Sequence, residues 1–366
     1  MNASVAISES LSNMFGAYLG EGAALLAAFL WAAATLMFGR LGRSLSPLVL
    51  NIVKGMWAIA MMLVTLHIQF GAIAMPPLPT ASVFYLVLSG ALGIGLGDTA
   101  YFAAINALGA RRALLLETLA PPMAAVLAWV FLAEQLSFAA VAGIAITLAG
   151  VAWVISERVP GTSTKKKEQN TTQPSKWRLG QSTAAGVRVA LLATFCQASG
   201  AVLSRAALAT TTVSPLHSSV IRLGAGLLFM GLLALSRPEY LESSEPKNRE
   251  AASNSYADTD TLTVHNSTVQ TPAACARWQR VWVRLRSPKL IGAVAAASFF
   301  ATYLGIWLQQ VSLKYAAAAG IAQALLATSP LFVIPMAALL GEKLSWRAVL
   351  GVAVSLCGVW LLLFAS

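Results

Sequence analysis

Long apolar segments recur along the whole chain, and they constrain its fold more than any other feature. A hydrocarbon core about 30 Å thick requires about 20 mostly apolar residues in a transmembrane helix. Ten segments approach that length: 22–39, 47–68, 82–105, 112–133, 137–155, 184–205, 214–235, 289–311, 315–340 and 345–364. Lipid offers the backbone no water, so each segment must satisfy its amides as a helix, and barrel strands would be shorter and alternating. The sequence therefore predicts an all-α integral membrane protein with ten transmembrane helices.

The composition points to the same class of protein. Hydrophobic residues make up 57% of the chain and charged residues 11%, with a mean hydropathy of +0.71, whereas a soluble domain carries about 25% charged residues. The net charge of +11 lies between the apolar segments rather than on a basic face with interleaved aromatics. We therefore expect the lipid bilayer, and not nucleic acid, as a partner. The three cysteines share no metal-ligand spacing, and we expect neither a metal nor a cofactor.

Two polar segments organise the chain. Residues 156–183 contain KKKEQNTTQPSK and form a linker between a first domain at 22–155 and a second at 184–364. The second domain contains an insert at 237–287, whose serine, threonine, asparagine and charged residues are typical of disorder. The insert ends in RWQRVWVRLR, which is suited to an amphipathic helix at the membrane surface.

The two domains repeat one pattern. A shift of 208 residues aligns 119–151 with 327–359, and 12 of those 33 positions are identical, including a proline, a glutamate, a serine and two glycines. A weaker match near the front of each domain, with a shift of 168, places Lys54 on Arg222. Each repeat has five helices, an odd number, so the second must cross the membrane inverted. Such inverted repeats are typical of transporters that alternate access around a central site.

The distribution of cations predicts the orientation. The loops after the odd-numbered helices hold 20 of the 25 lysines and arginines. The positive-inside rule then places these loops in the cytoplasm and both termini outside. We expect a multi-pass protein of a bacterial inner (plasma) membrane.

Two cations lie inside expected helices, Lys54 in NIVKGMW and Arg222 in SVIRLGA. Charges in a bilayer are costly, and they usually face the bundle interior and mark a pathway or an ion pair. One interpretation is a pair of cations that flank a central cavity and attract a substrate carboxylate. The other is structural, with each cation neutralising a neighbouring acid or capping freed carbonyl groups.

Two acids and several polar side chains complete the expected cavity. Asp98, Tyr101 and Glu117 could form a polar wall, and a buried carboxylate among them could carry a coupling proton. The structural alternative is that Asp98 only pairs with Lys54. Three glutamines are further candidates for the cavity lining or for bonds between helices: Gln197, Gln309 and Gln323.

Prolines occur in the fourth helix of each repeat, where they remove backbone hydrogen bonds and interrupt the helix. Pro121, Pro122 and Pro330 could expose polar backbone to a substrate or serve packing alone.

The acid and the serine that follow each of these helices suggest a structural hinge at the membrane surface. The serine would cap the next helix, with the acid beside it satisfying free amides. The four hinge residues are Glu134, Ser137, Glu342 and Ser345.

The segments GDTAYFAAINALGARRALLLETLAPPMAAVLAWVFLAEQLS and AGIAQALLATSPLFVIPMAALLGEKLSWRAVLGVAVSLCGVW resemble the ten-helix EamA-like branch of the drug/metabolite transporter superfamily. The resemblance implies a central cavity enclosed by helices 1–4 and 6–9, with helices 5 and 10 peripheral. It also implies a basic residue at the positions of Lys54 and Arg222. The superfamily is usually described with cytoplasmic termini, which conflicts with the orientation expected from the cations.

These observations predict a secondary active transporter, an exporter of small metabolites such as amino acids that works by alternating access as a monomer or homodimer. The chain has no HExxH, GxSxG or Walker motif, and we expect no catalytic residues. The alternatives are an importer or exchanger of the same superfamily, or a membrane enzyme acting on a lipid-linked substrate.

Overall fold

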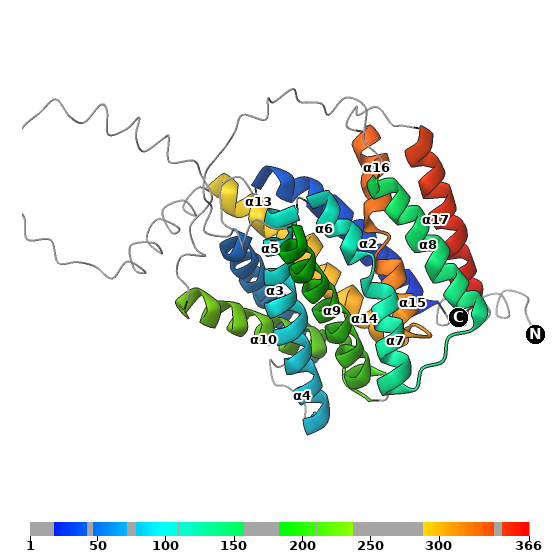
Figure 1. The fold of residues 1–366 in the computed structure, drawn as a ribbon. Helices are drawn as coiled ribbons and strands as arrows, with labels where there is room; N and C mark the ends of the chain where they lie inside the picture. Colours follow the sequence, from blue (N-terminus) through cyan, green and yellow to red (C-terminus); the bar gives the residue numbers. More distant parts are fainter. Residues whose placement is uncertain are drawn as a thin grey trace, which may run out of the picture.

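The computed structural model describes residues 18–41, 47–71, 78–108, 110–156, 183–209, 211–236, 288–339 and 346–365, and within them every regular element is a helix (Figure 1). The first domain forms α2 (Leu19–Leu41), α3 (Pro47–Phe70), α4 (Thr80–Ser89), η1 (Gly90–Gly97), α5 (Asp98–Leu108), α6 (Ala110–Glu117), α7 (Ala120–Leu132) and α8 (Phe138–Ser156). The second forms α9 (Thr183–Leu208), α10 (Pro215–Ser236), α13 (Pro288–Ser298), η3 (Phe299–Leu304), α14 (Gly305–Tyr315), α15 (Ala319–Leu326), α16 (Ser329–Leu339) and α17 (Trp346–Ala365). Glu342, Ser345, most of the linker and the insert at 237–287 lie outside the described residues.

In the described part of the chain, seven helical stretches are long and apolar enough to cross a membrane: Leu48–Phe70, Thr80–Ile105, Arg112–Leu132, Phe138–Ser156, Ala184–Leu208, Pro215–Ser236 and Ile291–Tyr315. Three shorter apolar helical stretches accompany them, Leu19–Ala34, Ala319–Val333 and Val349–Phe364. Large apolar side chains such as Phe131 and Phe138 are exposed on the outside of the bundle, where lipid would cover them. The chain is therefore a multi-pass, all-helical membrane protein.

Two long helices each contain a π-helical turn, and the turns occupy matching positions. η1 interrupts the helix that runs from α4 to α5, and η3 interrupts the helix that runs from α13 to α14. The 208-residue shift found in the sequence maps η1 onto residues 298–305, which contain η3. Such π-helical turns occur frequently at functional sites.

The glycines of GALGIGLG explain how η1 packs so closely against the second domain. A side chain at Gly90 would collide with the backbone carbonyl of Arg222 in α10. A Cβ atom at Gly200 in α9 would lie 3.0 Å from the Cα atom of Gly93. Small residues thus bring η1 into backbone contact with both α9 and α10, as in other tightly packed membrane helices.

A second interruption lies between α6 and α7, and again between α15 and α16. The helices break at Thr118–Leu119 and at Ala327–Thr328. Pro121 and Pro122 lie at the start of α7, and Pro330 follows the first residue of α16. Proline is tolerated in a first turn because its missing N–H would have no helical partner there. These prolines therefore begin helices rather than kink continuous ones.

The glycines that recur in both domains pack α8 along α17, as Figure 1 shows at one edge of the bundle. Side chains at Gly150 and Gly358 would collide with Ser355 and Thr147 of the opposite helix, respectively. A Cβ atom at Gly143 would lie 2.9 Å from Leu362. The fifth apolar segment of each domain thus packs on its counterpart through small residues, and this contact accounts for the repeated glycine spacing.

Candidate functional site

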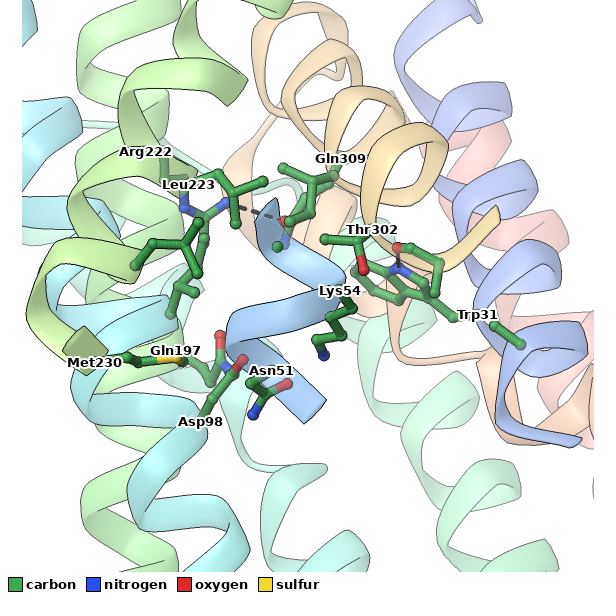
Figure 2. A pocket seen from close by; sticks show the side chains of 16 residues that line it. Trp31, Asn51, Lys54, Asp98, Gln197, Arg222, Leu223, Met230, Thr302 and Gln309 are labelled. Carbon is green, nitrogen blue, oxygen red and sulfur yellow. Dashed lines mark hydrogen bonds between the residues drawn. The ribbon is translucent and has the colours of Figure 1, made fainter. Parts of the chain in front are cut away.

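A cavity of about 270 Å³ lies in the bundle, and side chains from both domains line it. Figure 2 shows Asn51, Asp98 and Gln197 gathered on one side of this cavity and Arg222 with Gln309 across it. We call it the charged cavity. Its lining residues are Trp31, Ala34, Asn51, Lys54, Gly55, Ile94, Asp98, Gln197, Arg222, Leu223, Leu227, Met230, Ala301, Thr302, Ile306 and Gln309. Five of the residues expected from the sequence to face a cavity therefore lie together: Lys54, Asp98, Gln197, Arg222 and Gln309.

Arg222 is the largest buried side chain of the charged cavity, with an exposure of 2%. Its Nη1 atom donates to Gln309 Oε1 at 2.9 Å, and its Nε atom has no hydrogen-bond partner in the described part of the chain. Its Nη2 atom lies 3.1 Å from the place where a Cβ atom of Gly93 would stand. Because a buried donor without an acceptor is costly, this guanidinium is suited to an anionic ligand.

Asp98 begins α5 directly after η1, which places its carboxylate at the cavity wall. Its Oδ1 atom accepts a hydrogen bond of 2.9 Å from Gln197 Nε2. The carboxylate also interacts electrostatically with both Lys54 and Arg222. Asp98 therefore has a hydrogen-bond partner, Gln197, besides its electrostatic interaction with Lys54, and its role in transport stays a prediction.

Asn51 is a lining residue that the sequence analysis missed. It lies three residues before Lys54 in α3, so both side chains project from the same face of the helix. Asn51 is buried, with an exposure of 4%. A polar side chain one turn from a membrane-embedded lysine is a signal that could have identified it.

A second cavity, of about 640 Å³, adjoins the first. The two cavities share Trp31, Gln197 and Gln309. We call the second one the apolar cavity, because most of its wall consists of apolar side chains, among them Val151, Val154 and Ile155 of α8. The fifth helix thus lies at the edge of the bundle, as expected, but one part of it also lines this cavity.

Glu117 and Gln323 contribute polar groups to the apolar cavity, and Pro121 and Pro330 also line it. Tyr101 lines neither cavity, but its hydroxyl donates a hydrogen bond to the Glu117 carboxylate. Trp31 stands between the two cavities, and its Nε1 atom donates to Ala301 O in η3 at 2.8 Å. A side chain at Gly305 would collide with this indole, so the tryptophan fits closely against the π-helical turn.

The hinge after α7 lies away from both cavities. Ser137 Oγ accepts from Ala140 N at 3.1 Å at the start of α8. Glu134, in contrast, reaches a different helix: its Oε2 atom accepts from Ala319 N, the first residue of α15, at 2.8 Å, and its Oε1 atom pairs with Arg205 Nε at 2.7 Å. The expectation that Glu134 supports the amides of the following helix is corrected accordingly. Arg205 was not among the residues predicted from the sequence.

Arg205 also binds the connection between α14 and α15. Its guanidinium donates to the carbonyl oxygens of Leu313, Lys314, Ala316 and Ala317 at 2.8–3.3 Å. We call Glu134, Arg205 and residues 313–319 the clasp.

Charged side chains around an internal cavity are typical of helical membrane transporters, in which they mark a substrate pathway. The family model of the EamA-like transporter family matches residues 18–156 and 254–364. The chain belongs to this family, and thus to the drug/metabolite transporter superfamily, which confirms the resemblance seen in its sequence. No curated protein matches the chain. A solved structure titled "Crystal structure of protein" superimposes with a TM-score of 0.62 and 16% identity, over 93% of this chain and 95% of that one. At this identity the likeness shows the fold alone.

Proposed function

We propose that the protein is a secondary active transporter that exports a small metabolite by alternating access between two inverted repeats of five helices. The observation that carries the proposal is the mixed origin of the charged cavity. Lys54 and Asp98 come from the first domain, whereas Arg222 and Gln309 come from the second. A ligand bound by all four residues would contact both domains, so its binding would depend on how the two domains are placed relative to each other. Alternating access requires this dependence.

The substrate we propose is a small molecule with a carboxylate and an amine, such as an amino acid. Arg222 and Lys54 supply two cations for the carboxylate, and Asp98 supplies an anion for the amine. In a site of low dielectric constant, each of these pairings is much stronger than it is in water. The volume of about 270 Å³ suits a molecule of this size.

The apolar cavity supports a route for the substrate from one membrane side. α8 starts beside the clasp and ends at Ser156, so Val154 and Ile155 lie near the opposite end of the bundle. The apolar cavity therefore extends from the charged cavity away from the clasp. Ser156, at this end of α8, leads into the linker that its cations predict to be cytoplasmic, which favours loading from the cytoplasm and hence export.

A proton gradient is the driving force we propose, with Glu117 or Asp98 carrying the proton. Glu117 lines the apolar cavity and is bound to Tyr101, while Asp98 lines the charged cavity. Gln197 lines both cavities and is bound to Asp98. If Glu117 carries the proton, Asp98 stays available to bind the substrate amine, and Gln197 connects the two cavities.

The decisive experiment is counterflow of labelled amino acids in proteoliposomes that contain the purified protein. Lys54→Ala and Arg222→Ala should abolish uptake of the label, whereas the exposed Arg112 gives a matched control as Arg112→Ala. An imposed pH gradient should drive transport by the wild type. Of the two neutral variants, Glu117→Gln and Asp98→Asn, the one that replaces the proton-carrying acid should lose this response. Transport that is indifferent to both cavity substitutions would refute the proposed site.

The alternative functions give different results in the same membranes. An importer or exchanger would move the label in the opposite direction, or only against a counter-substrate, in vesicles of defined orientation. An enzyme acting on a lipid-linked substrate would change the mass of that lipid without moving a solute.

A further inference from the structure

We propose that Glu134 and Arg205 are gate residues of the transport cycle, and that the clasp opens when the charged cavity turns toward that side of the membrane. This inference rests on the proposed function and adds two residues to it. The sequence pattern had favoured a local hinge role for Glu134, yet its contacts run between domains.

Arg205 supplies most of the hydrogen bonds of the clasp. It stands near the C-terminal end of α9 and donates to four backbone carbonyls of the α14–α15 connection. Its Nε atom pairs with Glu134 at 2.7 Å. Every one of these acceptors is part of a connection or a helix end, where carbonyl groups lack helical partners.

Two carboxylates hold the amide side of the same connection. Glu134 accepts from Ala319 N, and Glu21 in the first turn of α2 accepts from Ala317 N at 3.2 Å. A carboxylate at the N-terminus of α15 is favoured by the helix dipole. The connection is thus held from both domains, by Glu21 and Glu134 of the first and by Arg205 of the second.

The position of the clasp matches the closed end of the substrate route. Neither Glu134, Arg205 nor residues 313–319 line either cavity. The apolar cavity extends away from the clasp, as α8 shows. Opening the charged cavity to the clasp side would require the α7 end, the α9 end and the α14–α15 connection to separate, and the clasp ties these three together.

The clasp is suited to opening because water can replace its bonds. The side chains of Arg205 and Glu134 are 10% and 15% exposed, so both are mostly buried but retain a small exposed area. Because Arg205 stands near the end of α9 and Glu134 in the hinge after α7, separation of these ends would let water replace the bonds and hydrate both charges. The clasp can therefore stabilise the state in which the cavity is closed on this side, and still open during the cycle.

The test measures the accessibility of the cavity from each side of the membrane. A cysteine replaces Ile306, which lines the charged cavity, after Cys196, Cys275 and Cys357 are changed to serine. A membrane-impermeant methanethiosulfonate reagent is then added to one side of oriented proteoliposomes. With the clasp intact, we expect labelling mainly from the side opposite the clasp.

Breaking the clasp should expose the cavity to the other side. We expect Arg205→Ala to raise the labelling rate from the clasp side by about tenfold or more, the shift that loss of a strong pairing gives to a two-state equilibrium. Arg205→Lys keeps the charge but reaches fewer carbonyls, and should give a smaller rise. Glu134→Gln can still accept from Ala319 N, and should give the smallest. Arg188, exposed near the other end of α9, supplies the control Arg188→Ala, which should change nothing.

The outcomes separate this inference from the proposed function. A labelling rate that rises most in Arg205→Ala, less in Arg205→Lys and least in Glu134→Gln, and that stays unchanged in Arg188→Ala, supports the gate. This result would hold even if no amino acid is transported. Unchanged labelling in Arg205→Ala and Arg205→Lys, both eluting as monodisperse folded protein, refutes it and leaves the clasp a structural tie. If Arg205→Ala does not fold, the same comparison between Arg205→Lys and Glu134→Gln decides.

Discussion

Two buried arginines on consecutive helices, Arg205 in α9 and Arg222 in α10, have opposite surroundings. Every hydrogen bond that the structure gives the Arg205 side chain ends on a backbone carbonyl or on Glu134. The Arg222 side chain, in contrast, has one partner, Gln309, and an Nε atom without an acceptor among the described residues. Arg205 lines no cavity, and Arg222 lines the charged one. A satisfied guanidinium holds protein to protein, while an unsatisfied one beside a cavity is available to a ligand. The number of N–H donors without an acceptor thus distinguishes a structural arginine from a ligand-binding one better than burial does.

The largest expected effect comes from Arg222. Arg222→Ala removes the unsatisfied guanidinium and should lower kcat/KM for a carboxylate substrate on the order of 100-fold, the effect of losing a buried charge-assisted pairing. Initial rates of counterflow in proteoliposomes measure it. Arg222→Lys keeps the charge but cannot reproduce the planar fork, and should recover part of the rate. If Arg222→Ala and Arg205→Ala lower the substrate affinity equally, the proposed distinction between the two arginines is wrong.

A smaller and more selective effect is expected at Asp98. Asp98→Asn keeps an oxygen that can accept from Gln197 but removes the negative charge beside Lys54 and Arg222. Transport of an amino acid should fall about tenfold, the usual effect of losing one charge-assisted hydrogen bond. Transport of the corresponding carboxylate without an amine should fall less or rise. Measuring both solutes in the same vesicles gives the ratio, and an unchanged ratio would remove Asp98 from substrate recognition.

A third prediction concerns stability rather than transport. Gly358→Ala puts a side chain against Thr147 between α8 and α17, and overpacking of this kind costs about 1–3 kcal/mol. The thermal midpoint in detergent should fall, while transport per folded molecule stays unchanged because neither arginine is touched. Gly292→Ala is the matched control, since a Cβ atom there meets nothing within 4 Å. Equal midpoints for the two variants would show that this helix contact is loosely packed.

Sequence patterns reached the class of fold and much of the cavity because both follow from local rules. Apolar runs must be helices in lipid, and membrane-embedded charges such as Lys54, Asp98 and Arg222 must face the interior. The partners of Glu134 and Arg205 could not be found in this way. They are set by which helix ends meet in space, and the acceptors of Arg205 are carbonyl groups that any residue type provides. Likewise, the sequence showed that two glycines recur in the repeat, while only the structure identifies the contact between α8 and α17 that they serve.

The smallest expected effect lies beside the clasp, at Ser137. Its hydroxyl accepts only from Ala140 N in the first turn of α8 among the bonds that the structure describes. Ser137→Ala should therefore lower the free energy of unfolding by about 1 kcal/mol, the usual cost of an N-cap, and leave cavity labelling from the clasp side unchanged. Glu134→Gln, three residues earlier, should do the reverse, with little loss of stability and a measurable rise in labelling. Thermal unfolding and thiol labelling of both variants decide whether this short hinge combines a local cap with a bond between domains. If Ser137→Ala also opens the cavity, the hinge acts as one unit and the contrast between its two polar residues is wrong.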